Sequence, residues 1–450
     1  MYKNKYLKYK NKYLELKTKY RVGPTEYDNG EKFSELRLLQ EGSYGKVYNI
    51  KDPTDASNRS NIAVKVLKED NPKHKKSLYD ECSILKKLKD APNIVQVKEN
   101  CKDDVKEQDT LTLELCENGS LSEFNDKLHS ILGRIRGMTY DKKFDILLGI
   151  IHYLFKQLVN AVERCHQLDI IHRDIKLSNC LLDKDFNLKL TDFGLSTYTP
   201  GDMNIIKGSG TPQYNAPELL YTQQGIKYLM FLKSFIVNSY ERIHRLAEQY
   251  KEFGNTKRGI KMAIQRVITG ALNIALPLTG LRFNKSMLNN MIDHELDESF
   301  SGETEDYNPD ESILHIASLI YDKIIIIDSL VDPLPIPEKA ATKIDIYAMG
   351  VFIYRLYLNK RIQEEPGSIP LSILDFNFNF DIYTKSGLNI LLDGMLDFNS
   401  DTRFTIQQIK ASAWYKNDSL ETKSIKVFND TARQTFVSIP QVLQFIKDIR

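Results

Sequence analysis

Cysteine and net charge are both scarce in this 450-residue sequence, and each shortage argues against a class of protein. The five cysteines are odd in number and include no C-x-x-C pair, so we expect neither a disulfide framework nor a zinc site. A formal charge of +2 gives the chain as a whole no reason to bind nucleic acid or an acidic membrane surface. These shortages predict a protein of a reducing, intracellular compartment that is not secreted.

The sequence also lacks a hydrophobic run of the length that a bilayer requires. Its longest apolar stretches lie near Ala271–Leu281 and Ile324–Ile327, whereas a membrane-spanning helix needs about 20 apolar residues. No apolar segment follows the lysine-rich N-terminus, which therefore differs from a secretory signal. We predict no membrane span.

What is present is the composition of a soluble globular protein, with 42% hydrophobic and 27% charged residues. The length predicts two or three domains, or one domain with large additions. Short runs rich in branched residues predict strands at 36–40, 46–50, 62–67, 94–99 and 111–116. Helical patterns occur near 75–88 and dominate from Leu121 onward, for example at 147–166. The chain should therefore form a small β-rich lobe followed by a larger helical lobe.

Residues 1–24 form a distinct basic tail that contains a repeat. The run Tyr-Lys-Asn-Lys-Tyr-Leu starts at Tyr2 and recurs at Tyr9, and residues 1–21 hold eight Lys or Arg against one Glu. A disordered basic tail, a short helix or coiled-coil seam, and a nucleic-acid contact all fit this pattern. The repeat resembles the start of giant DNA virus (mimivirus-like) proteins, which would make this a viral protein of the host cytoplasm or the virion.

The most specific motif is His172-Arg-Asp-Ile-Lys-Leu-Ser-Asn179. It resembles the catalytic loop of the protein kinase family, H-R-D-x-x-x-x-N. The resemblance implies that Asp174 accepts the hydrogen bond of the attacking hydroxyl, that Lys176 steadies the γ-phosphate, and that Asn179 reaches a metal ion. A lysine two residues after the aspartate is the pattern of Ser/Thr kinases.

A second motif, Asp192-Phe-Gly194, follows this loop after two short strand-like runs, with a turn expected between them at Asp183–Asn187. At this distance from Asp174 it resembles the D-F-G motif of the same family. Asp192 is then implied to hold Mg²⁺, a hard cation that prefers carboxylate oxygen.

The N-terminal part of the chain resembles the nucleotide site of the same family. The segment from Leu39 to Val47 looks like the glycine-rich loop over ATP, although Gln40 stands where the family has its first glycine. Gly42 and Gly45 would let backbone N–H groups approach phosphate oxygens. The residues of this loop that are implied to contact ATP are Leu39, Gln40, Glu41, Gly42, Ser43, Tyr44, Gly45, Lys46 and Val47.

Ile62-Ala-Val-Lys65 resembles the strand whose lysine contacts the α- and β-phosphates. Its ion partner is expected to be Glu81, with Asp80 as the alternative. The segment 111–121 resembles the fifth strand and hinge, which makes Leu113 the gatekeeper residue. The remaining implied contacts with adenine are the backbone of Glu114 and Cys116 at its edge, and Val47, Ala63 and Leu181 around the ring.

Two later segments complete the resemblance. The run from Gly210 to Glu218 looks like the end of the activation segment, where Thr211 would contact Asp174 and Lys176. Glu218 is expected to pair with Arg403. The stretch between Glu218 and Asp345 is much longer than the short helix and loop that the family has there. Residues 222–340 are therefore a predicted helical insertion, which is either passive or a docking element for a partner.

Together these matches imply the two-lobed α+β protein kinase fold over residues 33–416, with a small lobe at 33–117 and a large lobe at 118–416. Residues 417–450 would be a C-terminal extension. The implied activity is transfer of the γ-phosphate of ATP, with Mg²⁺, to Ser or Thr hydroxyls of a protein substrate. The alternatives are a pseudokinase scaffold whose insertion binds a partner, and a kinase that acts on small molecules.

Overall fold

The computed structural model divides the chain into two compact units, Met1–Tyr198 with Asp418–Arg450, and Thr199–Asn417. Within them the structure describes residues 26–28, 31–32, 37–41, 45–51, 61–69, 71–98, 101, 105, 109–199, 210–220, 341–358 and 387–449. The whole basic tail (residues 1–24), the glycine-loop residues 42–44 and the insertion at 222–340 lie outside the described residues, so the predictions made for them stay predictions.

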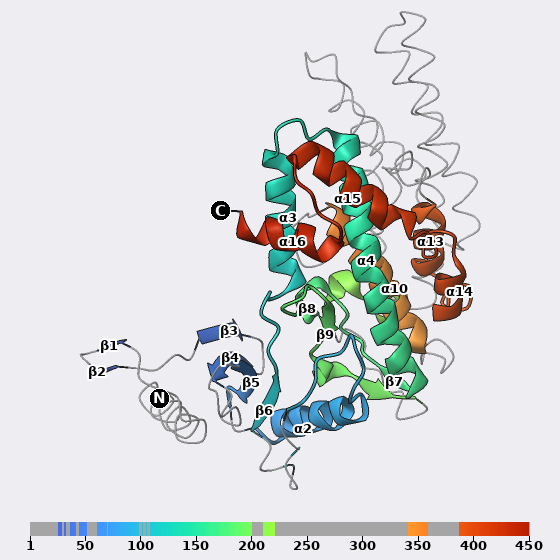
Figure 1. The fold of residues 1–450 in the computed structure, drawn as a ribbon. Helices are drawn as coiled ribbons and strands as arrows, with labels where there is room; N and C mark the ends of the chain where they lie inside the picture. The colour runs from blue at the N-terminus through green and yellow to red at the C-terminus, as the bar shows by residue number, and fades with distance from the viewer. Residues whose placement is uncertain are drawn as a thin grey trace, which may run out of the picture. The chain divides into compact units, whose positions relative to one another are not determined.

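The first unit begins with a small antiparallel sheet (Figure 1). A short hairpin, β1 (Glu26–Asp28) with β2 (Glu31–Lys32), precedes it. The four strands of the sheet lie in chain order: β3 (Arg37–Glu41), β4 (Gly45–Lys51), β5 (Asn61–Leu67) and β6 (Thr110–Glu114). Branched side chains suit such a pleated, half-buried surface. Four of the five predicted strands are thereby confirmed, each within a few residues of its expected bounds.

The strand expected at 94–99 is wrong, because this segment forms two isolated bridges, Ile94 to Leu190 and Val97 to Leu113. The backbone N–H of Val95 donates to the Leu190 carbonyl, whereas the N–H of Glu114 donates to the Gln96 carbonyl. The segment thus shares its backbone hydrogen bonds between two different strands. It makes a continuous ladder with neither, and instead connects them.

The first unit continues with three helices, each with a side-chain N-cap that satisfies a backbone N–H. They are α2 (Pro72–Lys87), capped by Asn71, α3 (Leu121–Arg134), capped by Ser120, and α4 (Tyr140–Gln167), capped by Thr139. The predicted helices were too short at their N-termini because the caps lie before the apolar pattern begins. The predicted order of a β-rich segment followed by helices is confirmed.

Short elements follow α4 and carry the candidate site. They are β7 (Ile170–Ile171), η2 (Leu177–Asn179), β8 (Cys180–Leu182), β9 (Leu188–Leu190), η3 (Phe193–Leu195) and β10 (Thr197–Tyr198). Strands β8 and β9 form a hairpin, and β7 pairs with β10. The turn expected at Asp183–Asn187 is confirmed, since Oδ1 of Asp183 accepts the N–H groups of Asp185 and Asn187.

The C-terminal extension joins the first unit as two helices, α15 (Ser419–Ala432) and α16 (Ile439–Asp448). Figure 1 shows α15 lying along the N-terminal half of α4. The buried Ser424 hydroxyl donates to the Ile146 carbonyl at 2.8 Å, and His152 meets the Glu421 carboxylate at 2.9 Å. The extension is therefore an integral layer of this unit.

The second unit is helical in its described part. It contains η4 (Pro212–Tyr214), α5 (Pro217–Leu220), α10 (Ala341–Leu358), α13 (Leu388–Met395) and α14 (Ile406–Ala411). The predicted pair of Glu218 with Arg403 is confirmed as a two-pronged contact of 2.6 and 2.8 Å, and the Arg403 side chain is fully buried. Such a pair supplies geometric specificity to the packing around it.

Helix α4 passes a length and hydropathy test for a membrane span over Asp141–Gln167, but 72% of that segment is buried inside the protein. Its apolar face packs on α15 and β9. It is therefore the core helix of the first unit, which agrees with the prediction of no membrane span.

One prediction about the cysteines is wrong, since the structure joins Cys82 and Cys101 in a disulfide. Cys82 lies on the buried face of α2, and the two Cα atoms are 5.8 Å apart, within the range that a disulfide spans. The two cysteines are 19 residues apart in sequence and belong to no recognisable cysteine motif. Cys116, Cys165 and Cys180 are buried and lie outside this disulfide.

The close contact of α4 with α15 depends on Gly149. A Cβ atom at this position would lie 2.2 Å from Cβ of Ser424 and 2.7 Å from the Leu420 carbonyl oxygen, so one helix would have to move. We predict that Gly149→Ala lowers the free energy of unfolding by about 1–3 kcal/mol. Denaturant titration of the purified protein measures this change.

Gly133→Ala is the matched control, because Gly133 lies in α3 with nothing within 4 Å of its added Cβ. It should leave stability unchanged or raise it by up to about 1 kcal/mol through better helix propensity. Equal effects of the two substitutions would contradict a tight contact between α4 and α15.

Candidate active site

One face of the sheet gathers four of the predicted nucleotide-site residues. The strand register pairs Val47 with Lys65 across β4 and β5, and Ala63 with Leu113 across β5 and β6. Directly paired residues and residues two apart on one strand point to the same face. Val47, Ala63, Lys65 and Leu113 therefore share one face of the sheet, as their predicted roles require.

The structure gives a reason for glycine at position 45 that the sequence did not indicate. A Cβ atom there would lie 2.8 Å from the Val66 carbonyl oxygen of the neighbouring strand. The close approach of β4 to β5 thus requires glycine. Beside it, Glu41 pairs with Lys46 at 3.3 Å and with Lys68 at 2.8 Å, while Leu39, Gln40 and Glu41 are exposed on β3.

Lys65 lies between two carboxylates. Its Nζ is 2.7 Å from Oε2 of Glu81 on α2 and 2.8 Å from Oδ1 of Asp192. The alternative partner Asp80 is exposed and pairs instead with Lys76, one turn away on the same helix. Glu81 is therefore the partner of Lys65, as the sequence predicted.

The electrostatics of this cluster follow from its burial. Burial alone would lower the pKa of Lys65, but the carboxylates of Glu81 and Asp192 outweigh it and hold that pKa above its usual value. The charge of Lys65 lowers the pKa of Asp192, whereas burial raises the pKa of Glu81 against the opposing effect of Lys65. A charged lysine thus compensates two acids that would otherwise repel each other.

The segment after β9 is held in an unusual backbone shape. Asp192 has a φ of 65°, in the left-handed region that only a few non-glycine residues adopt. The Ser77 hydroxyl on α2 donates to the Gly194 carbonyl at 3.1 Å, and the His172 ring packs on the Phe193 ring with centroids 4.7 Å apart. These contacts join α2, the catalytic-loop segment and the Asp192 segment.

Asp174 is the centre of a second cluster. Its Oδ2 atom accepts hydrogen bonds from Nζ of Lys176 at 2.7 Å and from Nδ2 of Asn179 at 2.9 Å. Asn179 Nδ2 also donates to the Asp174 backbone carbonyl at 2.8 Å, and the N–H of Asp174 donates to Nδ1 of His172. The three predicted catalytic side chains are therefore brought together within one loop.

The predicted metal ligands suit a hard cation. Asp192 contacts Lys65 through Oδ1 and stays 44% exposed, while Asn179 contacts Asp174 through Nδ2. Asp192 and Asn179 would offer a cation one carboxylate and one amide oxygen. Among the described residues no group of three or more His, Cys, Asp or Glu could hold a metal. Magnesium fits such a sparse site, because it commonly takes one or two protein oxygens plus phosphate oxygens of a substrate.

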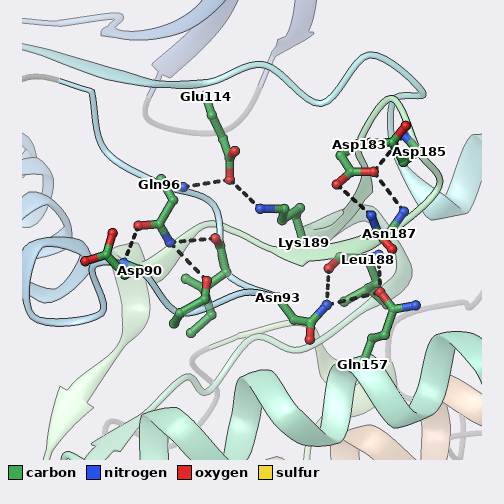
Figure 2. A network of polar contacts seen from close by, with 12 residues as sticks. Asp90, Asn93, Gln96, Glu114, Gln157, Asp183, Asp185, Asn187, Leu188 and Lys189 are labelled. Carbon is green, nitrogen blue, oxygen red and sulfur yellow. Dashed lines mark hydrogen bonds and ion pairs between the residues drawn. The ribbon is translucent and has the colours of Figure 1, made fainter.

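The hinge segment is anchored by a polar network (Figure 2). The Glu114 carboxylate accepts the N–H of Gln96 at 3.0 Å and pairs with Nζ of Lys189 on β9, also at 3.0 Å. The Gln96 side chain bonds in turn to the N–H of Asp90 and to the carbonyls of Ala91 and Ile94. The sequence assigned Glu114 a backbone role only, and the structure adds this side-chain role.

A second branch of the network fixes β9. Asn93 Nδ2 donates to Oε1 of Gln157 on α4 and to the Leu188 carbonyl, and the Leu188 N–H donates to the same Gln157 oxygen (Figure 2). The sequence could have indicated a structural role for Lys189, because this residue lies between Leu188 and Leu190 in a short strand-like run. Nothing in the sequence indicated the roles of Gln96 and Gln157, because no sequence motif identifies the distant groups to which a glutamine side chain bonds.

Three further residues of the predicted site lie on other elements. Leu181 lies on β8 opposite Lys189, and Cys116 is buried just beyond β6, both consistent with an adenine slot. Thr211 lies in the second unit at the start of η4, so its role beside Asp174 stays a prediction.

Comparison with known proteins agrees with this geometry. Residues 33–231 match the family described as Protein kinase domain. This region therefore resembles a protein kinase domain. The chain is similar to the CBL-interacting serine/threonine-protein kinase 16 of Arabidopsis thaliana, with 32% identity over 204 residues that cover 42% of this chain and 39% of that protein.

The kinase domain has further relatives. The serine/threonine-protein kinase zyg-8 of Caenorhabditis elegans is 35% identical over 198 residues, which cover 42% of this chain and 22% of that protein. The probable serine/threonine-protein kinase MARK-C of Dictyostelium discoideum is 32% identical over 195 residues, which cover 43% of this chain and 22% of that protein. The chain thus spans less than half the length of these three relatives.

The ion pair of Glu114 with Lys189 is partly buried, so the effects of substituting its two residues on stability should depend on each other. We predict a coupling free energy of about 1 kcal/mol between Glu114→Gln and Lys189→Met. Denaturant unfolding of the wild type, both single variants and the double variant measures it. The exposed pair of Lys76 with Asp80 is the control, with an expected coupling of about 0–0.5 kcal/mol. A hinge pair that couples no more strongly than this control would contradict the anchoring role.

Proposed function

We propose that this protein is a Ser/Thr protein kinase that transfers the γ-phosphate of ATP to hydroxyl groups of a protein. The observation that carries the proposal is the pair of bonded clusters in one unit. One cluster is Lys65 with Glu81 and Asp192, and the other is Asp174 with Lys176 and Asn179. Each matches a part that phosphoryl transfer needs, namely placement of the nucleotide and activation of the hydroxyl.

Asp174 acts on the hydroxyl of the substrate. Its carboxylate is only 7% exposed and is held by Lys176 and Asn179, so it points in a fixed direction. It accepts the hydroxyl proton as the oxygen attacks the γ-phosphorus atom. Lys176 lies 2.7 Å from Asp174 and places a positive charge where the phosphoryl group gains negative charge.

Lys65 acts on the nucleotide. Its charge is maintained by Glu81, so that its ammonium group can bind the α- and β-phosphates. Asp192 and Asn179 would hold Mg²⁺, which when bound neutralises phosphate charge. The face that carries Val47, Ala63 and Leu113 supplies the apolar surface for the adenine ring.

Specificity for Ser and Thr rests on two features. Lys176 stands two residues after Asp174, and the names of the three relatives above specify serine/threonine kinases.

The test is transfer of labelled γ-phosphate from ATP to mixed peptides that offer Ser, Thr or Tyr. The wild type should label Ser and Thr peptides, and Asp174→Asn should lower the rate at least about 100-fold while the protein stays folded. Asp80→Asn is the matched control on an exposed helix face and should keep the wild-type rate. A wild type that binds ATP without turnover would contradict the proposal and support a pseudokinase scaffold instead.

A further inference from the structure

The disulfide lies directly beside the active-site glutamate. Cys82 follows Glu81 on α2, and both side chains are buried, at 1% exposure each. Cys82 therefore belongs to the part of the helix that positions the Glu81 carboxylate at Lys65. Any restraint on Cys82 is a restraint on the placement of Glu81.

Cys101, the second cysteine of the disulfide, follows three residues after Lys98, the last residue of the segment 90–98, which is bonded to the sheet. The Lys98 N–H donates to the Thr112 carbonyl at 2.9 Å, and the Glu114 N–H donates to the Gln96 carbonyl at 2.9 Å. The same segment bonds to Leu190 of β9, two residues before Asp192. The disulfide thus connects α2 to the hinge strand and, through β9, to the Asp192 segment.

The docked position of α2 needs such a restraint. The Glu81 carboxylate is almost fully buried, and burying an ion pair costs desolvation free energy that the mutual attraction of the charges does not always recover. The Ser77 hydroxyl adds one further contact of α2 with the site, to the Gly194 carbonyl of the Asp192 segment. A covalent link reduces the conformations open to the undocked helix, and so it favours the docked one.

We propose that the Cys82–Cys101 disulfide is a positioning bond for Glu81, so that ATP binding and phosphotransfer respond to the thiol–disulfide state of this pair. Both effects rest on the proposed function: the effect on ATP binding rests on its nucleotide site at Lys65, and the effect on phosphotransfer rests on its catalytic step at Asp174.

The chemistry is ordinary thiol–disulfide exchange. A small-molecule thiolate attacks the sulfur of Cys101, which is half-buried, whereas Cys82 is fully buried. The Cys82 thiolate leaves and takes a proton, and a second thiolate then releases Cys101 as a thiol. In the reverse direction a small disulfide such as oxidised glutathione accepts the two electrons. Two protein thiols then become one disulfide, and two small thiols are released.

The experiment compares the full chain after oxidised glutathione with the full chain after dithiothreitol. Thiol alkylation of the unfolded protein should count three free thiols in the oxidised form and five in the reduced form, because the sequence has five cysteines and three lie outside the bond. The reduced form should bind ATP with Mg²⁺ about three- to tenfold more weakly by calorimetry, with a matching rise in KM for ATP.

Three variants separate positioning from general stability. Cys101→Ser should bind ATP like the reduced form under both conditions, while Cys165→Ala, outside the disulfide, should keep the full redox response. In Glu81→Gln the redox state should still shift the melting temperature but should no longer change ATP affinity. A redox effect on affinity that persists in Glu81→Gln would overturn the positioning role.

The remaining outcomes are also decisive. Equal ATP affinity of two forms with different thiol counts would overturn the inference, and so would five free thiols after oxidised glutathione. If both forms bind ATP with the expected difference but neither labels any peptide, the proposed kinase function fails and the positioning role of the disulfide stands.

Discussion

The contact of Lys65 with two carboxylates is the constraint on which the first unit depends. Glu81 can be buried only if a cation meets it, and Asp192 can approach Glu81 only if the same cation lies between them. The sheet supplies the lysine, α2 supplies one acid, and the segment after β9 supplies the other. A single ammonium group therefore fixes three elements that are far apart in sequence, and it does so where the nucleotide phosphates would bind.

Around that contact, the segment 90–98 forms hydrogen bonds both to the sheet and to the helical part of the first unit. The Gln96 N–H donates to the carboxylate of Glu114 at the hinge, while the Asn93 side chain donates to Gln157 on α4 (Figure 2). Because amide and carboxylate groups satisfy each backbone group in turn, the hinge is held without a regular strand at this position. The predicted adenine slot and the cluster around Lys65 thus share one support, and the disulfide attaches α2 to the same support.

Sequence reasoning succeeded where chemistry fixes the spacing. Asp174 and Asn179 must meet within one loop, and their close spacing in the chain allows Nδ2 of Asn179 to reach Asp174. Likewise Asp183 stabilises its own turn through local hydrogen bonds. Reasoning failed where the partner is distant and has no signature. The odd number of cysteines argued against a disulfide, and no sequence pattern marked Gly149 in α4 as a contact residue. The reason for that glycine is Ser424, which lies close to the other end of the chain.

That contact has a consequence for the order in which the molecule is assembled. The face of α4 at Gly149 is covered by α15, yet the whole second unit, Thr199–Asn417, separates the two parts of the first unit in the chain. At ribosomal speeds of about 5–20 residues per second, the apolar side of α4 stays uncovered for roughly 10–45 s while the second unit is being made. The first unit is therefore completed only after residues Thr199–Asn417 have been synthesised.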